Sequence, residues 1–475
     1  MSTTKDHSGG LARRSVTPFE VTAQSVANIA PSAVIAFTPM FMAGSAGNGA
    51  WFSFAVGMAI ILIIAQSIVS IARRRAGAGS LYSLIRPAVG PMGTFITGWG
   101  LFVGAIGIAA GSLAGAGFFA AEFLKSLGLP DLSSPMGQIV LDAILLVVAI
   151  WLTISSVRIS ARVSATLEVI SIIVIVIVLV IVWFQSGNFI DGAQFSLSGA
   201  TADGVVYAVV LAILGFVGFE GAAALGEESD DPYRAIPRAI RGGAIFAGIL
   251  YIWATYVQVA AFPGGAAGLA GAGSPMEDLA RNYGLDGFVP LLNLGFTASF
   301  VAVVMAAITV AGRLLFSWGN EGIIGKQFGK AHPKFRTPSY AIWWTLPMII
   351  IPAGYEVYIV GEAPLNVTTY LDTIGVFGYM LAYLVVCLFA PVFLRKVGDK
   401  QVVLTQILGI IGAAALAYVY WVNIAGTTPP FSDLPLWFAG AVVLGVGFFL
   451  SVRARNPKAA NAAGTFADEN PEKVS

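Results

Sequence analysis

Long apolar runs recur along the whole chain, and short polar segments separate them. Twelve of these runs reach the roughly 20 residues that a helix needs to cross the apolar part of a bilayer. They lie near residues 19–44, 51–72, 91–123, 137–157, 163–185, 203–226, 238–262, 288–313, 339–360, 366–393, 402–423 and 433–452. The pattern predicts an all-α polytopic membrane protein with twelve transmembrane helices.

Composition supports this prediction and removes several classes of function. Hydrophobic residues make up 57% of the chain and charged residues only 11%, whereas about 25% of the residues of a soluble domain are charged. Cys387 is the single cysteine, and the two histidines, His7 and His332, fall outside the apolar runs. We therefore expect neither a metal site nor a cofactor.

The distribution of basic residues predicts the orientation in the membrane. With the N-terminus placed inside and alternate loops assigned to each side, 24 of the 26 Lys and Arg residues fall in cytoplasmic segments. Lys125 and Arg281 are the two exceptions. Because cytoplasmic loops carry an excess of Lys and Arg, both termini are expected in the cytoplasm of a plasma (inner) membrane protein.

Two spans contain residues that disfavour a continuous helix. The first reads SVANIAPSAVIAF, with Pro31 near its middle, and the sixth reads GFVGFEGAAALGEE, with Gly215, Gly218 and Gly221 around Glu220. Taken singly, these features also fit a simple kink and close helix packing. Together they lie five spans apart, in helices of opposite direction. That arrangement predicts a five-plus-five inverted repeat (LeuT-like) with broken helices 1 and 6.

The repeat sets the expected domain organisation. Residues 19–360 form the transport core with helices 1–9, the two repeats being helices 1–5 and 6–10. Residues 361–455 hold helix 10 and the peripheral helices 11 and 12. Residues 1–18 and 456–475 are polar and are expected to be disordered cytoplasmic tails; the first lacks the features of a signal peptide.

Broken helices expose backbone groups that can bind a small zwitterion. The amide end of a half-helix is positive and attracts an anion, whereas the carbonyl end attracts a cation. A free amino acid carries both charges on neighbouring atoms. The two breaks could therefore bind its carboxylate and its ammonium without any charged side chain.

Several segments resemble the amino acid–polyamine–organocation (APC) permeases. GFEGAAALGEESDDPYRAIPRAI, at residues 218–240, resembles the sixth-helix motif of that family: GFE or GFD, a short apolar stretch, EE-x-x-x-P, an Arg and I-P-x-A-I. ANIAPSAVIAF resembles the first helix, and RRRAGAGSLYSLIRPAVGPMGTFITGW the join of helices two and three. AGRLLFSWGNEGIIGKQFGKAHPKFRTP and APVFLRK resemble the ends of helices eight and ten. The resemblance covers about residues 17–455 and implies secondary active transport of amino acids or amines.

The resemblance also implies a set of site residues. It places the substrate carboxylate at the first break, formed by Ile29, Ala30, Pro31, Ser32 and Ala33. It places the ammonium against the carbonyls of Phe216, Val217, Gly218 and Phe219, next to Glu220. Some members carry a lysine in helix five; the corresponding position here is about Ser171, and Glu168 lies one turn earlier.

Ionisable residues within apolar spans are functional candidates, since their insertion costs at least about 2.5 kcal/mol. Glu220 could brace the broken helix or bind a proton or the substrate amine. Glu168 could pair with a loop arginine or take part in coupling, while Asp142 and Asp372 are expected at the outer interface. Glu227 and Glu228, at the end of span six, could hold an inner gate or form a solvated loop. Thr297 and Ser299 could ligate sodium.

The most consistent function is a permease for amino acids or related amines, coupled to protons or to an exchanged solute. A polyamine-specific importer and a sodium-coupled symporter remain alternatives. The expected partners are the small-molecule substrate, the coupling ion and membrane lipid, with no nucleic acid. The sparse intramembrane charge disfavours a channel, the missing catalytic motifs disfavour an enzyme, and the short tails disfavour a non-transporting nutrient sensor.

Overall fold

The computed structural model describes residues 16–76, 79–155, 157–226, 228–425, 432–466 and 468–469. The first half contains α1 (Pro18–Ile29), α2 (Pro31–Ala46), η1 (Gly47–Gly49), α3 (Ala50–Ala72), β1 (Arg75–Ala76), α4 (Leu81–Ser126), α5 (Pro135–Ser155), α6 (Val157–Ser186), α7 (Gly192–Phe195), α8 (Ala202–Phe216) and η2 (Gly221–Leu225). The second half contains α9 (Pro232–Ala261), α10 (Gly265–Ala270), α11 (Pro275–Asn282), η3 (Asp286–Phe288), α12 (Val289–Glu321), α13 (Ser339–Gly354), η4 (Tyr355–Val360), α14 (Pro364–Lys396), α15 (Val402–Ala425), α16 (Leu434–Arg455), α17 (Pro457–Asn461) and β2 (Asp468–Glu469). The prediction of an all-helical polytopic protein is confirmed, apart from a two-residue pairing of β1 with β2.

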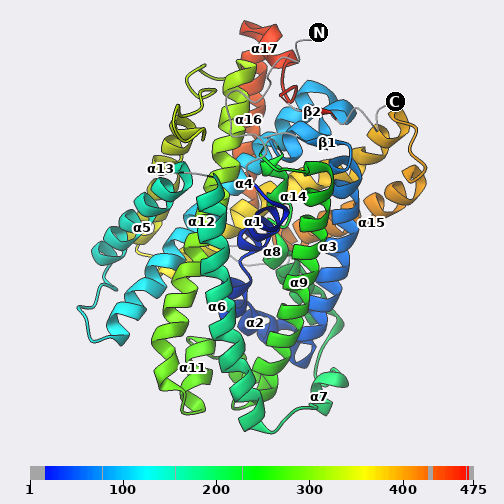
Figure 1. Ribbon diagram of the computed structural model, residues 1–475. Helices are drawn as coiled ribbons and strands as arrows, with labels where there is room; N and C mark the ends of the chain where they lie inside the picture. Colours follow the sequence, from blue (N-terminus) through cyan, green and yellow to red (C-terminus); the bar gives the residue numbers. More distant parts are fainter. Residues whose placement is uncertain are drawn as a thin grey trace.

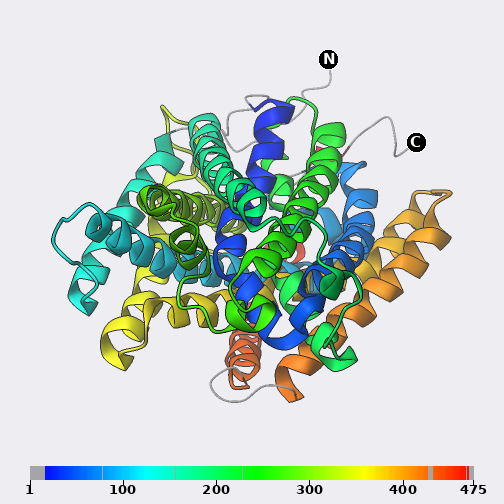
Figure 2. The ribbon, with the colours of Figure 1, turned by 90° about the horizontal axis from the view of Figure 1, so that it is seen from below.

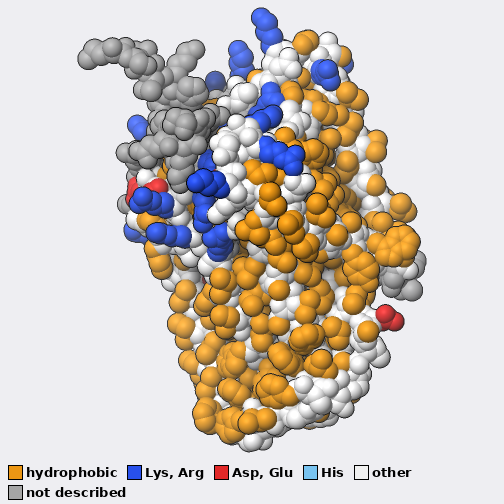
Figure 3. Space-filling model, turned by 90° about the vertical axis from the view of Figure 1, so that its right-hand side faces the viewer, with side chains coloured by type: hydrophobic (Ala, Val, Ile, Leu, Met, Phe, Trp, Pro, Cys, Tyr) orange, Lys and Arg blue, Asp and Glu red, His pale blue; other side chains and the backbone are white. Residues whose placement is uncertain are grey.

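The surface is that of a membrane protein. Eleven stretches of the described chain are long and apolar enough to cross a bilayer, and the first of them, Pro18–Ala72, contains α1, α2 and α3 and thus two of the predicted spans. Large apolar side chains such as Trp151, Phe184 and Trp437 are exposed. Figure 3 shows an apolar band around most of one face, with Lys and Arg gathered toward the end where the termini lie in Figure 1. The exact count of twelve remains a prediction.

The middle of the bundle is built from α4, α12 and α14, with α1 and α2 passing through the centre (Figure 2). One face of α4 carries Gly107, Gly111 and Gly115. A side chain at Gly107 or Gly111 would collide with α14, and one at Gly115 would meet the ring of Phe300 in α12. These glycines let the backbones approach closely.

Both predicted interruptions are present. α1 ends at Ile29, Ala30 adopts a left-handed conformation (φ 52°, ψ 63°), and α2 begins at Pro31. Proline is favoured at the first position of a helix, where a missing amide hydrogen costs nothing. Pro31 therefore starts a new helix and does not merely kink one. α8 ends at Phe216, and Gly218 takes a φ of 97° before η2 begins.

Parts of both predicted tails are ordered, which corrects the expectation of disorder for the described portion. Val16 pairs with the segment after η2, since its amide donates to the Glu228 carbonyl at 3.0 Å. After α16 the chain forms α17 and continues to Phe466, with Ala459, Ala460 and Ala463 buried. Residues 1–15 and 470–475 lie outside the described part of the chain.

The C-terminal segment joins the ends of α4 and α12. Tyr82 donates a hydrogen bond from its hydroxyl to Glu321. The amide of Gly464 donates to the Tyr82 hydroxyl at 2.9 Å, and the amide of Phe466 donates to Glu321 Oε1 at 3.2 Å. Arg86 adds a bond from its guanidinium to the Asn461 carbonyl at 2.9 Å. The segment thus seals one end of the bundle core.

Candidate functional site

A cavity of about 270 Å³ lies where the two interruptions meet. Ile29, Ala30 and Ala33 line it from the first interruption, and Gly215 and Val217 from the second. α4, α12, α14 and α15 supply the remaining walls with Ile108, Ser112, Phe300, Val303, Thr369, Asp372, Thr373, Val376 and Asn423. Further lining residues follow α2 as far as Phe41 and α8 back to Tyr207, so the cavity extends away from α1 and the termini.

The backbone of the second interruption is held by side chains of α1. Ser25 donates to the carbonyl of Phe219 at 2.5 Å, and Asn28 donates to the carbonyl of Gly218 at 2.8 Å. The Phe216 carbonyl accepts the amide of Phe219 at 3.3 Å. Of the four residues predicted to present carbonyls to an ammonium, Val217 alone lines the cavity. An unpaired buried backbone group is costly, and here these side chains satisfy the groups that the break exposes.

Glu220 lies behind the interruption and does not line the cavity. Its side chain is 1% exposed and accepts a hydrogen bond from the hydroxyl of Tyr383 in α14. The same hydroxyl accepts the amide of Gly218 at 3.1 Å. Glu220 is thereby tied to the unwound backbone through Tyr383, in the manner of the brace considered from the sequence.

Glu168, from α6, reaches the first interruption. It is 1% exposed, and its two carboxylate oxygens accept the amide of Ser32 at 2.9 Å and the hydroxyl of Ser299 at 2.5 Å. A carboxylate at the N-terminus of a helix is stabilised by the helix dipole. Ser171, one turn further along α6, packs instead against Gly295 of α12. The acid that faces the break is therefore Glu168, whereas Pro31 and Ser32 do not line the cavity.

Two further acids lie in the protein interior and not at the interface expected from the sequence. Asp142 is 1% exposed and accepts the side-chain amide of Gln138 at 3.2 Å. Asp372 lines the cavity from α14. The carboxylate of Asp372 packs directly against Gly111 of α4, because a side chain at that glycine would collide with it.

On the side of the termini, the core is closed by ion pairs. Glu228 pairs with Arg313 of α12, and the two side chains are 0% and 2% exposed. The interpretation of Glu228 as part of a solvated loop is wrong, while Glu227 lies outside the described residues. Arg162 pairs with Glu20 of α1 at 2.6 Å.

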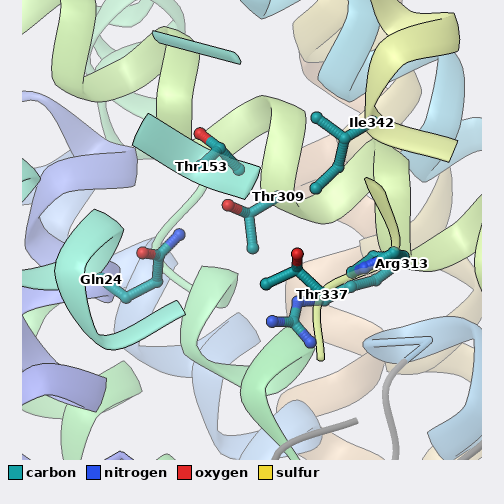
Figure 4. Close-up of a pocket in the computed structure, with 7 residues that line it drawn as sticks. Gln24, Thr153, Thr309, Arg313, Thr337 and Ile342 are labelled. Carbon is teal, nitrogen blue, oxygen red and sulfur yellow. The ribbon is translucent and has the colours of Figure 1, made fainter. Parts of the chain in front are cut away.

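A small cavity of about 10 Å³ adjoins Arg313, room for about one water molecule. Gln24, Thr153, Thr309 and Thr337 line it from α1, α5, α12 and the segment before α13 (Figure 4). Its polar walls and its size suit a bound water better than a substrate. The space therefore belongs to the closed end of the core.

The remaining candidates are engaged locally. Thr297, considered for sodium, donates to the carbonyl of Asn293 in its own helix at 2.8 Å. Within the described residues, no three His, Cys, Asp or Glu side chains are grouped as a metal site requires.

Four functional residues were not predicted from the sequence: Ser25, Asn28, Tyr383 and Arg313. Ser25 and Asn28 are three residues apart on one helical face, which was the available signal.

Comparison with known proteins identifies the family. The family model described as amino acid permease matches residues 17–449. The branched-chain amino acid permease BcaP of Bacillus subtilis is 24% identical over 346 residues, 70% of this chain and 72% of that protein. The low-affinity putrescine importer PlaP of Escherichia coli is 26% identical over 312 residues, covering 61% of this chain and 64% of the importer. An uncharacterized transporter of Mycobacterium tuberculosis is 24% identical over 414 residues, 85% of this chain and 83% of that protein. The chain thus belongs to the amino acid permease family, which comprises membrane transporters and not enzymes.

Proposed function

We propose that this protein is a secondary transporter that moves amino acids or related organic amines across the plasma membrane through the cavity between the two interruptions. The main observation behind this proposal is that both unwound junctions line the same cavity: Ile29 and Ala30 belong to the first junction and Val217 to the second. The five-plus-five inverted repeat, with twelve spanning helices, accounts for two facing breaks in helices five spans apart. The names of two relatives, a branched-chain amino acid permease and a putrescine importer, span the same range of substrates.

Substrate binding and coupling are assigned to the residues at the breaks. Ile29, Ala30, Ala33 and Val217 contact the substrate. Glu220, which lies behind the second interruption, binds and releases a proton and acts on the cavity wall through Tyr383, and this links proton movement to transport. The support is the continuous contact from the carboxylate to Tyr383 and from there to the Gly218 amide. Sodium coupling and exchange are the alternatives for the same cavity.

The Glu220→Gln variant tests this function. Purified protein in proteoliposomes is expected to show saturable uptake and counterflow, which a channel does not show. In the variant, uptake should persist but lose its dependence on an imposed pH gradient, because glutamine keeps the hydrogen bonding and cannot titrate. Tyr383→Phe is the matched variant, since it removes the connecting hydroxyl and leaves the acid. An unchanged pH profile in Glu220→Gln would reduce Glu220 to a structural brace.

We also propose that both termini are cytoplasmic, because the basic residues gather at the end of the molecule where Figure 1 places α17. Cysteines introduced at Ser2 and Ser475 should escape an impermeant thiol reagent in intact cells and react after permeabilisation. The background is low, since the one native cysteine, Cys387, is buried. Labelling in intact cells would reverse the assigned orientation.

A further inference from the structure

We propose that the cavity selects an organic cation that carries a primary ammonium and no neighbouring carboxylate, and that Asp372 is the residue that pairs with this ammonium. The inference rests on the proposed transport function and narrows its substrate class. Two independent observations carry it: the charge of the cavity wall, and the state of the backbone at the start of α2.

The described wall of the cavity holds one strongly ionisable side chain, and it is an acid. Asp372 is the one acidic residue among those that line it, and no Lys or Arg lines it in the described part of the chain. Asp372 Oδ1 is buried and has no hydrogen-bond partner among the described residues. The carboxyl group interacts with the backbone of Ser112, and a buried carboxyl oxygen without a donor is costly. An ammonium bound in the cavity would supply the countercharge that the described wall lacks.

The start of α2, where a substrate carboxylate was expected, has few amides left to bind one, and Ala33 carries the one without an assigned acceptor. Pro31 has no amide hydrogen, and the amide of Ser32 donates to Glu168. The amide of Ala30 donates to the Val26 carbonyl at 3.1 Å, and that of Val34 donates to the Ala30 carbonyl at 3.1 Å. Glu168 thus takes the place of an external anion at the positive end of the half-helix.

A second carboxylate at this junction would be repelled. It would lie beside Glu168 in a site where no basic side chain of the described chain lines the cavity. Like charges in a low-dielectric environment interact strongly. The arrangement therefore disfavours α-amino acids and favours amines.

The rest of the wall suits a methylene chain. Val34, Leu211, Leu214, Val303 and Val376 provide apolar surface along the cavity. Thr369 and Thr373, on the same helix as Asp372, and Asn423 of α15 add neutral polar groups. An aliphatic amine can bury its chain against the first set while its ammonium reaches the carboxylate.

The test compares ligands that differ by one group. Proteoliposomes containing the full chain are assayed for binding and uptake of butylamine, 1,4-diaminobutane, 4-aminobutanoate and ornithine, which is 1,4-diaminobutane with a carboxylate on one terminal carbon. We expect the two amines to bind roughly 10–100-fold more tightly than their carboxylated counterparts, the range of one charged hydrogen bond gained or lost.

Variants of Asp372 test whether this residue binds the ammonium. Asp372→Asn should weaken amine binding by roughly 10–100-fold, Asp372→Glu should retain part of it, and Asp286→Asn, in the exposed segment before α12, should change nothing. Thermal unfolding of each variant reports whether it is folded. Amine binding that survives in Asp372→Asn would overturn the assignment of Asp372. Ornithine or a neutral amino acid binding as tightly as the amines would overturn the substrate class and leave the proposed transport function intact. A lack of saturable flux for every amine and amino acid would overturn both.

Discussion

Replacing Arg313 with alanine should destabilise the protein by about 3–5 kcal/mol, the cost of leaving one member of a buried ion pair without its partner. Glu228 is fully buried and pairs with Arg313, whose side chain is 2% exposed. In the variant, the Glu228 carboxylate would remain in the core with its countercharge removed. The expected readout is a large fall in the thermal unfolding midpoint of detergent-purified protein.

Two further variants test whether the loss of stability comes from breaking the buried ion pair between Arg313 and Glu228. The double variant Arg313→Met with Glu228→Leu removes both charges and should regain most of the lost stability, since apolar replacements of buried pairs are often neutral or stabilising. Arg234→Ala breaks an exposed pair with Asp231, in which the arginine side chain is 77% exposed, and should change the stability by about 0–1 kcal/mol. Equal effects of Arg234→Ala and Arg313→Ala would contradict the explanation by burial.

Gly218→Ala should abolish transport. The φ of Gly218 is 97°, a region that side chains with a Cβ rarely adopt, and an added Cβ would lie 2.7 Å from both the side-chain nitrogen and the carbonyl oxygen of Asn28. Such backbone conformations cost roughly 1–3 kcal/mol for non-glycine residues, and overpacking adds about 1–3 kcal/mol. Relief would require α1 to move away from the second interruption, which would open the wall of the cavity.

The measurement is uptake together with thermal unfolding. Gly242→Ala is the control, because a Cβ at that helical position meets no atom within 4 Å and alanine favours a helix by about 1 kcal/mol over glycine. Gly242→Ala should therefore match or exceed the stability of the native protein. Normal transport by Gly218→Ala would show that the second interruption tolerates a side chain.

The positions of both breaks could be predicted from the sequence because their causes are local. Pro31 lacks an amide hydrogen, and Gly218 permits a positive φ, whatever surrounds them. The groups that satisfy the exposed backbone could not be predicted in the same way. Glu168 lies 136 residues from Ser32, and its closeness in sequence to Arg162 favoured a loop pairing that the structure gives to Glu20 instead.

The position of an acidic residue along its apolar run was also a poor predictor of what surrounds its side chain. Asp142 and Asp372 lie near the ends of their apolar runs, which pointed to the membrane interface. Whether such a residue faces lipid, protein or a cavity depends on the rotation of its helix against its neighbours. For Asp372, the rotation of α14 is fixed by its close contact with the glycine face of α4 at Gly111.

The docked C-terminal segment has a consequence for the order in which the molecule is made. The described lining of the cavity is complete once Asn423, its last residue in the sequence, has left the ribosome and packed. Tyr82 and Glu321 receive the amides of Gly464 and Phe466 only after α16 and α17 have also been synthesised. A nascent chain therefore passes through a stage in which its central cavity is built while the buried carboxylate of Glu321 still lacks one of its donors. The segment that follows α17, and not the insertion of α16, completes this end of the core.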